Sequence, residues 1–235
     1  MSKPSEQPGL PNALFEVATL LAMLAAIGAI FLYVPDDALQ GPVQRIFYVH
    51  LAMWLSTTYP AFAVFGVASM LYLWTREPQW DRLGHAAAEL GLLFCTLGLA
   101  TGSIWAKPAW NVWWTWDARL TFSMILWMIY AAYLLLRTLV QNEDLARLLS
   151  AIFSASGLAV SYLTYKAVYW WRSIHPAVIV TREGSSGLPD PRMQITLVVT
   201  LIAFFLLFLW LMRVRVHTAR LQEEAEELRA TIVRA

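Results

Sequence analysis

Cysteine is almost absent from this sequence, whose 235 residues include only Cys95. A single thiol cannot form a disulfide within the chain, and neither a CxxC nor a CxxCH motif is present. These absences exclude a dithiol oxidoreductase and a c-type cytochrome. Cys95 lies in an apolar stretch, where a small core side chain is the simplest interpretation.

Charged residues are also scarce, at 14% of the chain, against roughly 25% in soluble domains. They separate apolar runs of about 20 residues, the length of a helix that crosses a bilayer. The net charge of +1 provides no basic field for nucleic acid. The sequence has no Walker loop, no Ser-His-Asp pattern and no zinc-ligand spacing. It therefore predicts a polytopic membrane protein in which any use of ATP belongs to a partner.

We predict an all-α membrane protein of one domain, residues 1–235, with six transmembrane helices. The predicted spans are about 14–34, 46–74, 85–104, 119–136, 148–171 and 193–212. The first run is too long for the apolar region of a cleaved signal peptide, so it is predicted to remain as a span. Residues 213–235 are charged and predict a solvated helical tail, with a short coiled segment or a partner contact as the alternative.

An even number of spans places both termini on one side of the membrane. Ten of the 17 Lys and Arg residues fall in the segments on that side, and seven fall on the other. This modest excess predicts cytoplasmic termini by the positive-inside rule. The connections at residues 38–45, 105–121 and 172–192 then share the opposite, outer face.

Tryptophan is concentrated between the third and fourth spans, where five of the 12 residues fall within Trp105–Thr121. A plain connection is typically built from Gly, Ser, Asn and Pro. If this segment is helical, Trp110, Trp113 and Trp114 share one face at i, i+3 and i+4, which predicts an interfacial helix lying in the membrane surface. An aromatic belt is the alternative, but it explains this density poorly. We interpret the segment as a platform for a flat apolar ligand.

Two of the four histidines, His50 and His175, fall on the same predicted outer face as the tryptophans, whereas His85 and His217 fall on the inner face. Each taken alone is typical of an interfacial hydrogen-bonding residue, although an ionisable residue near a span is also a functional candidate. Two imidazoles beside a flat aromatic surface are what axial ligation of a haem iron requires. His50 and His175 are therefore the predicted metal ligands.

Asp117 and Arg119 stand at the start of the fourth span. Asp117 could cap that helix, and Arg119 could anchor to lipid phosphate; both roles are compatible with a ligand contact. Several outer-face cations could meet haem propionates, and the sequence does not choose among Arg45, Lys107, Arg119, Arg172 and Arg182.

The segment Trp105–Thr121 resembles the tryptophan-rich (WWD) signature of haem-handling proteins in cytochrome c biogenesis. The six-span layout and the length resemble the smallest branch of that family, cytochrome c maturation protein C (haem exporter protein C). The resemblance runs from Arg45–His50, through the tryptophan segment, to Trp170–His175. Ala106 and Asn111 stand where that family often has glycine, which makes the backbone of the platform less permissive.

The resemblance implies a b-type haem, held non-covalently and transiently at the periplasmic face of a bacterial inner membrane, with His50 and His175 as its axial ligands. It implies as partners an ABC transporter, a very small membrane subunit and a periplasmic haem chaperone. The expected protein is a haem-binding and delivery scaffold and not an enzyme, any catalysis of covalent attachment being shared with the chaperone. The residues expected to hold or support the haem are His50, Trp105, Trp110, Trp113, Trp114, Trp116, Asp117, Arg119 and His175.

Three alternatives belong to other functional classes. A haem transporter would move haem through its own bundle, where Glu89 and Lys166 are the main polar residues. A structural membrane subunit of an ABC transporter complex would bind no haem. A dihaem cytochrome would need a second histidine pair inside the helices, and the sequence has none.

Overall fold

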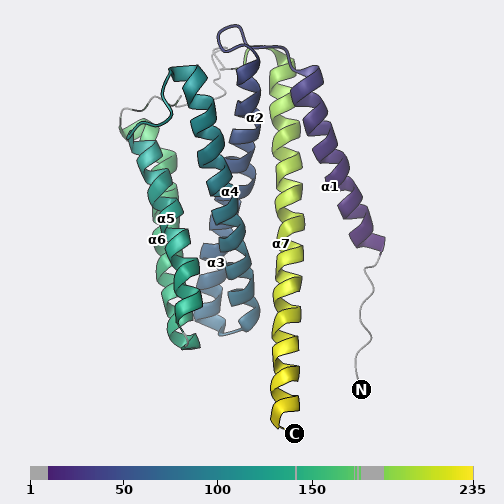
Figure 1. Ribbon diagram of the computed structural model, residues 1–235, viewed down its shortest axis with the longest axis vertical. Helices are drawn as coiled ribbons and strands as arrows, with labels where there is room; N and C mark the ends of the chain where they lie inside the picture. Colours follow the sequence, from purple (N-terminus) through teal and green to yellow (C-terminus); the bar gives the residue numbers. More distant parts are fainter. Residues whose placement is uncertain (1–9, 141, 172, 174, 176–187, 235) are drawn as a thin grey trace.

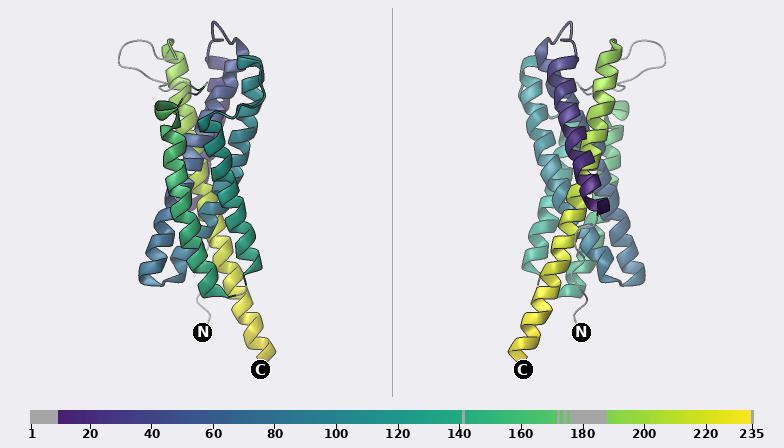
Figure 2. Two further views of the ribbon diagram at one scale, coloured as in Figure 1. Left: turned by 90° about the vertical axis from the view of Figure 1, so that its left-hand side faces the viewer. Right: turned by 90° about the vertical axis from the view of Figure 1, so that its right-hand side faces the viewer.

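A computed structural model describes residues 10–140, 142–171, 173, 175 and 188–234 of the chain. Within these residues, six helical stretches are long and apolar enough to cross a membrane, and they lie side by side in one bundle (Figures 1 and 2). This confirms the predicted all-α fold with six membrane helices. The α-helices are α1 (Leu10–Gly28), α2 (Arg45–Ala52), α3 (Tyr59–Thr75), α4 (Pro78–Trp110), α5 (Ala118–Leu139), α6 (Glu143–Trp170) and α7 (Pro191–Arg234).

The second membrane-spanning stretch, Pro42–Thr75, changes its helical type along its length. A 3₁₀ turn leads into α2, and a π-helical segment, Met53–Thr58, separates α2 from α3. Pro60 explains the interruption, because it has no N–H to donate and its ring crowds the carbonyl four residues earlier. The wider π-helical turn absorbs this conflict, and such turns are frequent at functional sites.

Helix α4 extends beyond the predicted span 85–104 at both ends. It begins at Pro78, since a missing N–H costs nothing in the first turn of a helix. It ends at Trp110, where Asn111 adopts the left-handed conformation with φ of 59°. The predicted interfacial helix is therefore wrong. Trp110 closes α4, and Trp113 and Trp114 lie in an irregular connection, because Asn111 stops the helix before them.

Helix α4 packs against four other helices, α2, α3, α5 and α7. Helix α1 lies at the margin and packs chiefly against α7 (Figure 1). The connections 34–41 and 111–117 lie at the same end of the bundle, named here the loop end (Figure 1). The C-terminal part of α7 projects beyond the other helices at the opposite end, the tail end (Figure 1). Of the three connections predicted to share one face, the first two thus lie at the same end of the bundle, and most of the third, 172–192, lies outside the described residues.

Aromatic rings from α3 and α5 fill the core towards the tail end. The rings of Phe62 and Tyr130 lie 4.0 Å apart between centroids, and those of Phe65 and Tyr133 lie 4.6 Å apart. All four side chains are buried. Gly91 of α4 allows this packing, because a Cβ there would lie 2.9 Å from Cε1 of Phe62.

Ion pairs tie α4 to its neighbours near the tail end. Asp81 accepts two hydrogen bonds from Arg137 of α5, at 3.1 and 2.9 Å. Glu89 pairs with Arg215 of α7 and with His85, whose Nε2 lies 3.4 Å from its carboxylate. Charges inside a bilayer are costly unless paired, so these contacts explain how the bundle accommodates them.

The tail, residues 213–234, is helical and its side chains are mostly exposed, as the sequence predicts. It is not a separate helix, because α7 runs without a break from Pro191 to Arg234. Arg82 of α4 donates a hydrogen bond of 2.6 Å to Glu223, which holds the first turns of the tail against the bundle.

We expect Gly91→Ala to destabilise the bundle by about 1–3 kcal/mol, the usual cost of overpacking a core. The reason is that Phe62 is fully buried against Tyr130 and cannot move away from the new methyl group. Gly28→Ala is the matched control, because its Cβ would meet nothing within 4 Å. Thermal unfolding in detergent, followed by circular dichroism, measures both. Equal midpoints for the two variants would contradict the close contact of α3 and α4.

Candidate functional site

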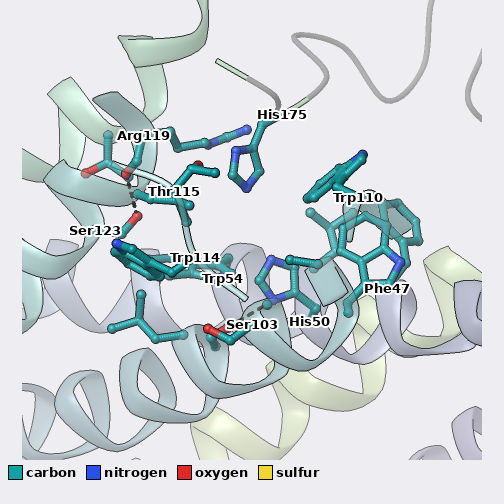
Figure 3. A pocket seen from close by; sticks show the side chains of 18 of the residues that line it. Phe47, His50, Trp54, Ser103, Trp110, Trp114, Thr115, Arg119, Ser123 and His175 are labelled. Carbon is teal, nitrogen blue, oxygen red and sulfur yellow. Dashed lines mark hydrogen bonds between the residues drawn. The ribbon is translucent and has the colours of Figure 1, made fainter. Parts of the chain in front are cut away.

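A cavity of about 300 Å³ lies at the loop end, between α2, α4, α5 and α6. Its wall is mostly apolar and aromatic, with a few polar groups from separate elements, which is the usual composition of a ligand pocket. Figure 3 shows the side chains of His50 and His175 directed into this space from different sides. The residues that contribute most of the wall are Phe47, His50, Trp54, Trp105, Trp110, Val112, Trp113, Trp114, Arg119, Ser123, Tyr165, Tyr169 and His175.

His50 is oriented by the backbone of α4. Its Nδ1 lies 3.0 Å from the carbonyl oxygen of Gly98 and 3.2 Å from the hydroxyl of Thr101. A carbonyl oxygen can only accept, so Nδ1 carries the proton and Nε2 keeps its lone pair. A histidine that ligates a metal commonly has this arrangement, with its second nitrogen donating to a carbonyl or carboxylate.

Two glycines of α4 make this contact possible. A Cβ on Gly102 would lie 2.9 Å from Cε1 of His50, and one on Gly98 would lie 2.9 Å from Nε1 of Trp54. His50 and Trp54 are four residues apart and therefore share one face of the second helical stretch. That face packs directly on the glycine face of α4, as small residues permit in a membrane.

His175 is oriented by the connection that precedes α5. Its Nδ1 lies 3.2 Å from the hydroxyl of Ser173 and 3.4 Å from the carboxylate of Asp117. The Ser173 hydroxyl donates to Asp117 at 3.2 Å, so it accepts from Nδ1–H of His175. Among the described residues, no hydrogen bond engages Nε2 of either His50 or His175. Both rings thus leave the same nitrogen available.

Asp117 itself is fixed by α5. Its carboxylate accepts a hydrogen bond of 3.0 Å from the backbone N–H of Leu120, so the predicted helix cap is confirmed. Burial lowers the pKa of His175 below its ordinary value, and the positive charge of Arg119 adds to this effect. The Asp117 carboxylate opposes the shift by raising the pKa. The net lowering favours the neutral imidazole, which is the form that binds a metal.

The five tryptophans of the segment occupy different positions. Trp105 is buried and lines the cavity; its Nε1–H donates to Gln40 at 2.8 Å, and its ring lies 5.9 Å from that of His50. Trp110, Trp113 and Trp114 line the cavity. Trp116 does not line it and is 75% exposed, beside Trp114. Nε1 of Trp114 is buried, and no described residue accepts its proton.

Among the cations, the geometry singles out Arg119, which lines the cavity and has no ion pair with a described carboxylate. Arg45 lies elsewhere and pairs with Asp36 at 2.9 Å. Lys107 donates to Asn111 at 3.0 Å. The two other sequence candidates, Arg172 and Arg182, lie outside the described residues.

The sequence interpretation missed the part of the wall formed by the π-helical segment Met53–Thr58, α3 and α6. Trp54 could have been found, because it follows His50 by four residues and so shares its helical face. Tyr165 and Tyr169 are also four residues apart, on α6, and Lys166 lies 5.5 and 5.6 Å from their ring centroids. No spacing in the sequence relates α6 to α2, so this pairing depends on the tertiary fold.

The chain is similar over most of its length to known proteins. The model of the family described as heme exporter protein C matches residues 7–231. A protein named Heme exporter protein C from Bradyrhizobium diazoefficiens is 35% identical over 216 residues, covering 88% of this chain and 79% of the relative. Proteins of the same name from Haemophilus influenzae and Escherichia coli K12 are 30% and 29% identical, covering 93% and 92% of this chain and 88% and 91% of the relatives.

We expect Asp117→Asn to lower the pKa of His175 further, because the substitution removes the negative charge that raises it. The pKa can be followed by NMR titration of protein labelled at histidine, with the resonance assigned through His175→Gln. Thr115→Val is the control, since it removes a neutral hydroxyl that contacts Asp117 at 3.4 Å and leaves the charge in place. An unchanged or raised pKa in Asp117→Asn would show that the carboxylate does not act on this ring.

Proposed function

Because this chain belongs to the heme exporter protein C family, we propose that it holds haem in the loop-end cavity during cytochrome c biogenesis and delivers it to a periplasmic haem chaperone. The observation that carries the proposal is the pair His50 and His175. Both rings face one cavity, and each has its Nδ1–H engaged and its Nε2 available.

The number of available nitrogens fits a haem iron, to which the porphyrin already supplies four ligands. A bare zinc ion takes three or four protein ligands. Among the described residues, no group of three or more His, Cys, Asp or Glu side chains could hold a metal ion. Two neutral imidazoles on different sides of one cavity therefore suit axial ligation better than a simple ion site.

The rest of the wall also suits a porphyrin. Trp54, Trp110, Trp113 and Trp114 line the cavity and offer ring surface to a flat ligand. The buried Nε1–H of Trp114 is a donor without an acceptor among the described residues, and buried donors in native proteins are normally paired. A polar group of the cargo would satisfy it. Trp116 does not line the cavity, so its proposed role is at the rim of the haem site.

Arg119 is proposed to meet a haem propionate. Its guanidinium is always charged and forms paired hydrogen bonds with a carboxylate. It lines the cavity two residues after Asp117, which caps the same helix. In this proposal Asp117 does not touch the haem, since its carboxylate is engaged with Leu120 and Ser173 and faces Nδ1 of His175.

Delivery to a chaperone requires the cargo to be reachable from the loop end. Trp113 and Trp116 are 59% and 75% exposed there, beside the cavity. The excess of Lys and Arg on the side of the termini supports cytoplasmic termini and a periplasmic loop end. The protein would act as a scaffold that binds haem non-covalently and transiently, in a complex with an ABC transporter and a small membrane subunit.

The rival in which haem passes through the bundle has less support. Its two polar candidates are engaged, because Glu89 pairs with Arg215 and His85, and Lys166 lies over tyrosine rings. Haem trapped near the middle of the bilayer would favour this rival. A protein without haem under any condition would favour a structural subunit.

We expect His50→Ala and His175→Ala each to remove one axial ligand. The visible spectrum of the purified protein, alone and co-expressed with the chaperone, should then lose Soret intensity or shift to a high-spin form. His217→Ala is the matched control, because His217 lies in the tail, far along the sequence from the cavity residues. Full occupancy with an unchanged spectrum in both cavity variants would remove the ligand assignment.

We expect Arg119→Gln to weaken haem binding about tenfold or more, since a hydrogen bond to a charged group contributes about 1.5–3 kcal/mol. The comparison that isolates the propionate is haem against its dimethyl ester. Wild type and Arg119→Gln should bind the ester alike, and Lys107→Gln should bind both ligands as wild type does. If the difference between wild type and Arg119→Gln persists with the ester, Arg119 acts on the protein and not on a propionate.

A further inference from the structure

The loop-end cavity reaches the surface of the bundle at two places. Four of the residues that line it are exposed, namely Leu55, Trp113, Tyr165 and Tyr169. Trp113 lies in the connection before α5, outside the membrane-spanning stretches. The other three lie within the stretches Pro42–Thr75 and Asp144–Trp170, so their exposed surface faces lipid. The cavity wall is therefore in contact with the bilayer as well as with the loop end.

The lipid-facing part of the wall comes from two helical stretches that separate towards the loop end. Where α3 and α6 meet, Gly66 has no room for a side chain, because Leu158 packs against its backbone. Eleven residues nearer the loop end, the two stretches carry Leu55 and Tyr169. These residues lie at similar depth, about 16 Å from the contact at 1.5 Å per residue. Both line the cavity, which thus occupies the space between the separated stretches.

The packing of the helices leaves this space open to the side. In the part of the chain that the structure describes, the packing partners of α6 are α3 and α5. The π-helical segment Met53–Thr58, which carries Leu55, packs instead against α4 and α7. We name the space between the two edges the side opening. Its edges are Leu55 on one side and Tyr165 with Tyr169 on the other.

A lysine lies at the α6 edge of the side opening. Nζ of Lys166 is 5.5, 5.6 and 5.9 Å from the ring centroids of Tyr165, Tyr169 and Tyr162. Cation–π contacts of this kind hold an ammonium group without neutralising its charge. Lys166 lies four residues before the end of α6, or about 6 Å, a depth from which a lysine head group reaches the membrane surface.

The residues at the side opening indicate the chemistry of a molecule that could pass through it. Its edges are apolar and aromatic, which suits a flat apolar ring. Lys166 at the edge and Arg119 in the cavity wall would each attract a carboxylate. Haem combines an apolar ring with two propionates, so both features of the opening match it.

We propose that haem enters the cavity from the membrane leaflet at the loop end, through the side opening, and that Lys166 attracts its propionates and passes them to Arg119. This inference rests on the proposed function and adds the route by which the cargo arrives. It differs from passage through the bundle, because haem does not cross the contact between Gly66 and Leu158.

The first experiment obstructs the side opening. Leu55→Cys is coupled through a disulfide to a bulky apolar label, and the full chain is placed in phosphatidylcholine vesicles to which haem is added. The appearance of the Soret band, followed by stopped flow, gives the loading rate. We expect the label to slow loading about tenfold or more, because a close-packed wall offers no other passage from lipid. Removal of the label with a thiol reagent should restore the rate.

Matched variants separate obstruction from a general effect of labelling. Val67→Cys is the control, because Val67 is 56% exposed on the same stretch and does not line the cavity. Tyr165→Cys and Tyr162→Cys form a second such pair on α6, each compared with its own unlabelled form. Wild type controls for the reagent, since its Cys95 is buried. Equal loading rates within both labelled pairs would overturn the proposal.

The order of labelling and loading shows whether the label acts on the route or on the site. When Leu55→Cys is labelled after haem is bound, we expect the Soret band to stay unchanged, because haem has already passed the opening. Displacement of bound haem by the label would overturn the proposal. A wild type that never acquires a Soret band would instead remove the proposed function itself.

The second experiment tests the charge of Lys166. We expect Lys166→Gln to slow the loading of haem about tenfold, the lower end of the effect of electrostatic steering on association rates. Loading of haem dimethyl ester, which has no carboxylate, should be equally fast in wild type and variant. Lys107→Gln is the matched control, because Lys107 is a loop-end cation that donates to Asn111. An equal loss of rate with the ester would overturn the role of Lys166.

Discussion

The close contact of His50 with α4 is the constraint on which the loop end depends. Gly98 and Gly102 have no side chains, so the α2 backbone approaches until the His50 ring lies against α4. At that distance Nδ1 reaches the Gly98 carbonyl, and this hydrogen bond fixes which nitrogen faces the cavity. A side chain at either glycine would separate the helices and remove the bond. The tautomer of His50 therefore depends on the close packing of α2 against α4.

Helix α4 joins this site to the tail end. The helix that supplies Gly98 and Gly102 near one end supplies Glu89 and Arg82 towards the other, where they pair with α7. The cavity wall and the direction of the tail are thus both set by one 33-residue helix. Its length is set by Pro78, which is favourable in the first turn of a helix, and by Asn111, whose left-handed conformation ends the helix. The sequence does not reveal the start at Pro78, because the residues around it are polar and resemble a loop.

The six helices could be predicted, because hydropathy and length report directly on a bilayer. The cap at Asp117 could also be predicted, since capping is local. The end of α4 at Trp110 was missed, because a left-handed asparagine interrupts a spacing of tryptophans that is otherwise helical. The partners of His50 and His175 could not be predicted. Gly98 is 48 residues from His50 and Asp117 is 58 from His175, so only the packing of the helices brings them together.

The two histidines differ in how much structure must be disrupted to move each ring away from the cavity. His50 lies within a helix, and its partner is a backbone carbonyl of a second packed helix, so freeing it requires the separation of α2 from α4. His175 lies beyond the end of α6, and its partners are the side chains of Ser173 and Asp117. Moving it requires rotation of a few backbone angles and the loss of hydrogen bonds that contribute about 1 kcal/mol each. Under the proposed function, release of the cargo therefore costs less on the His175 side, while His50 keeps its place in the bundle.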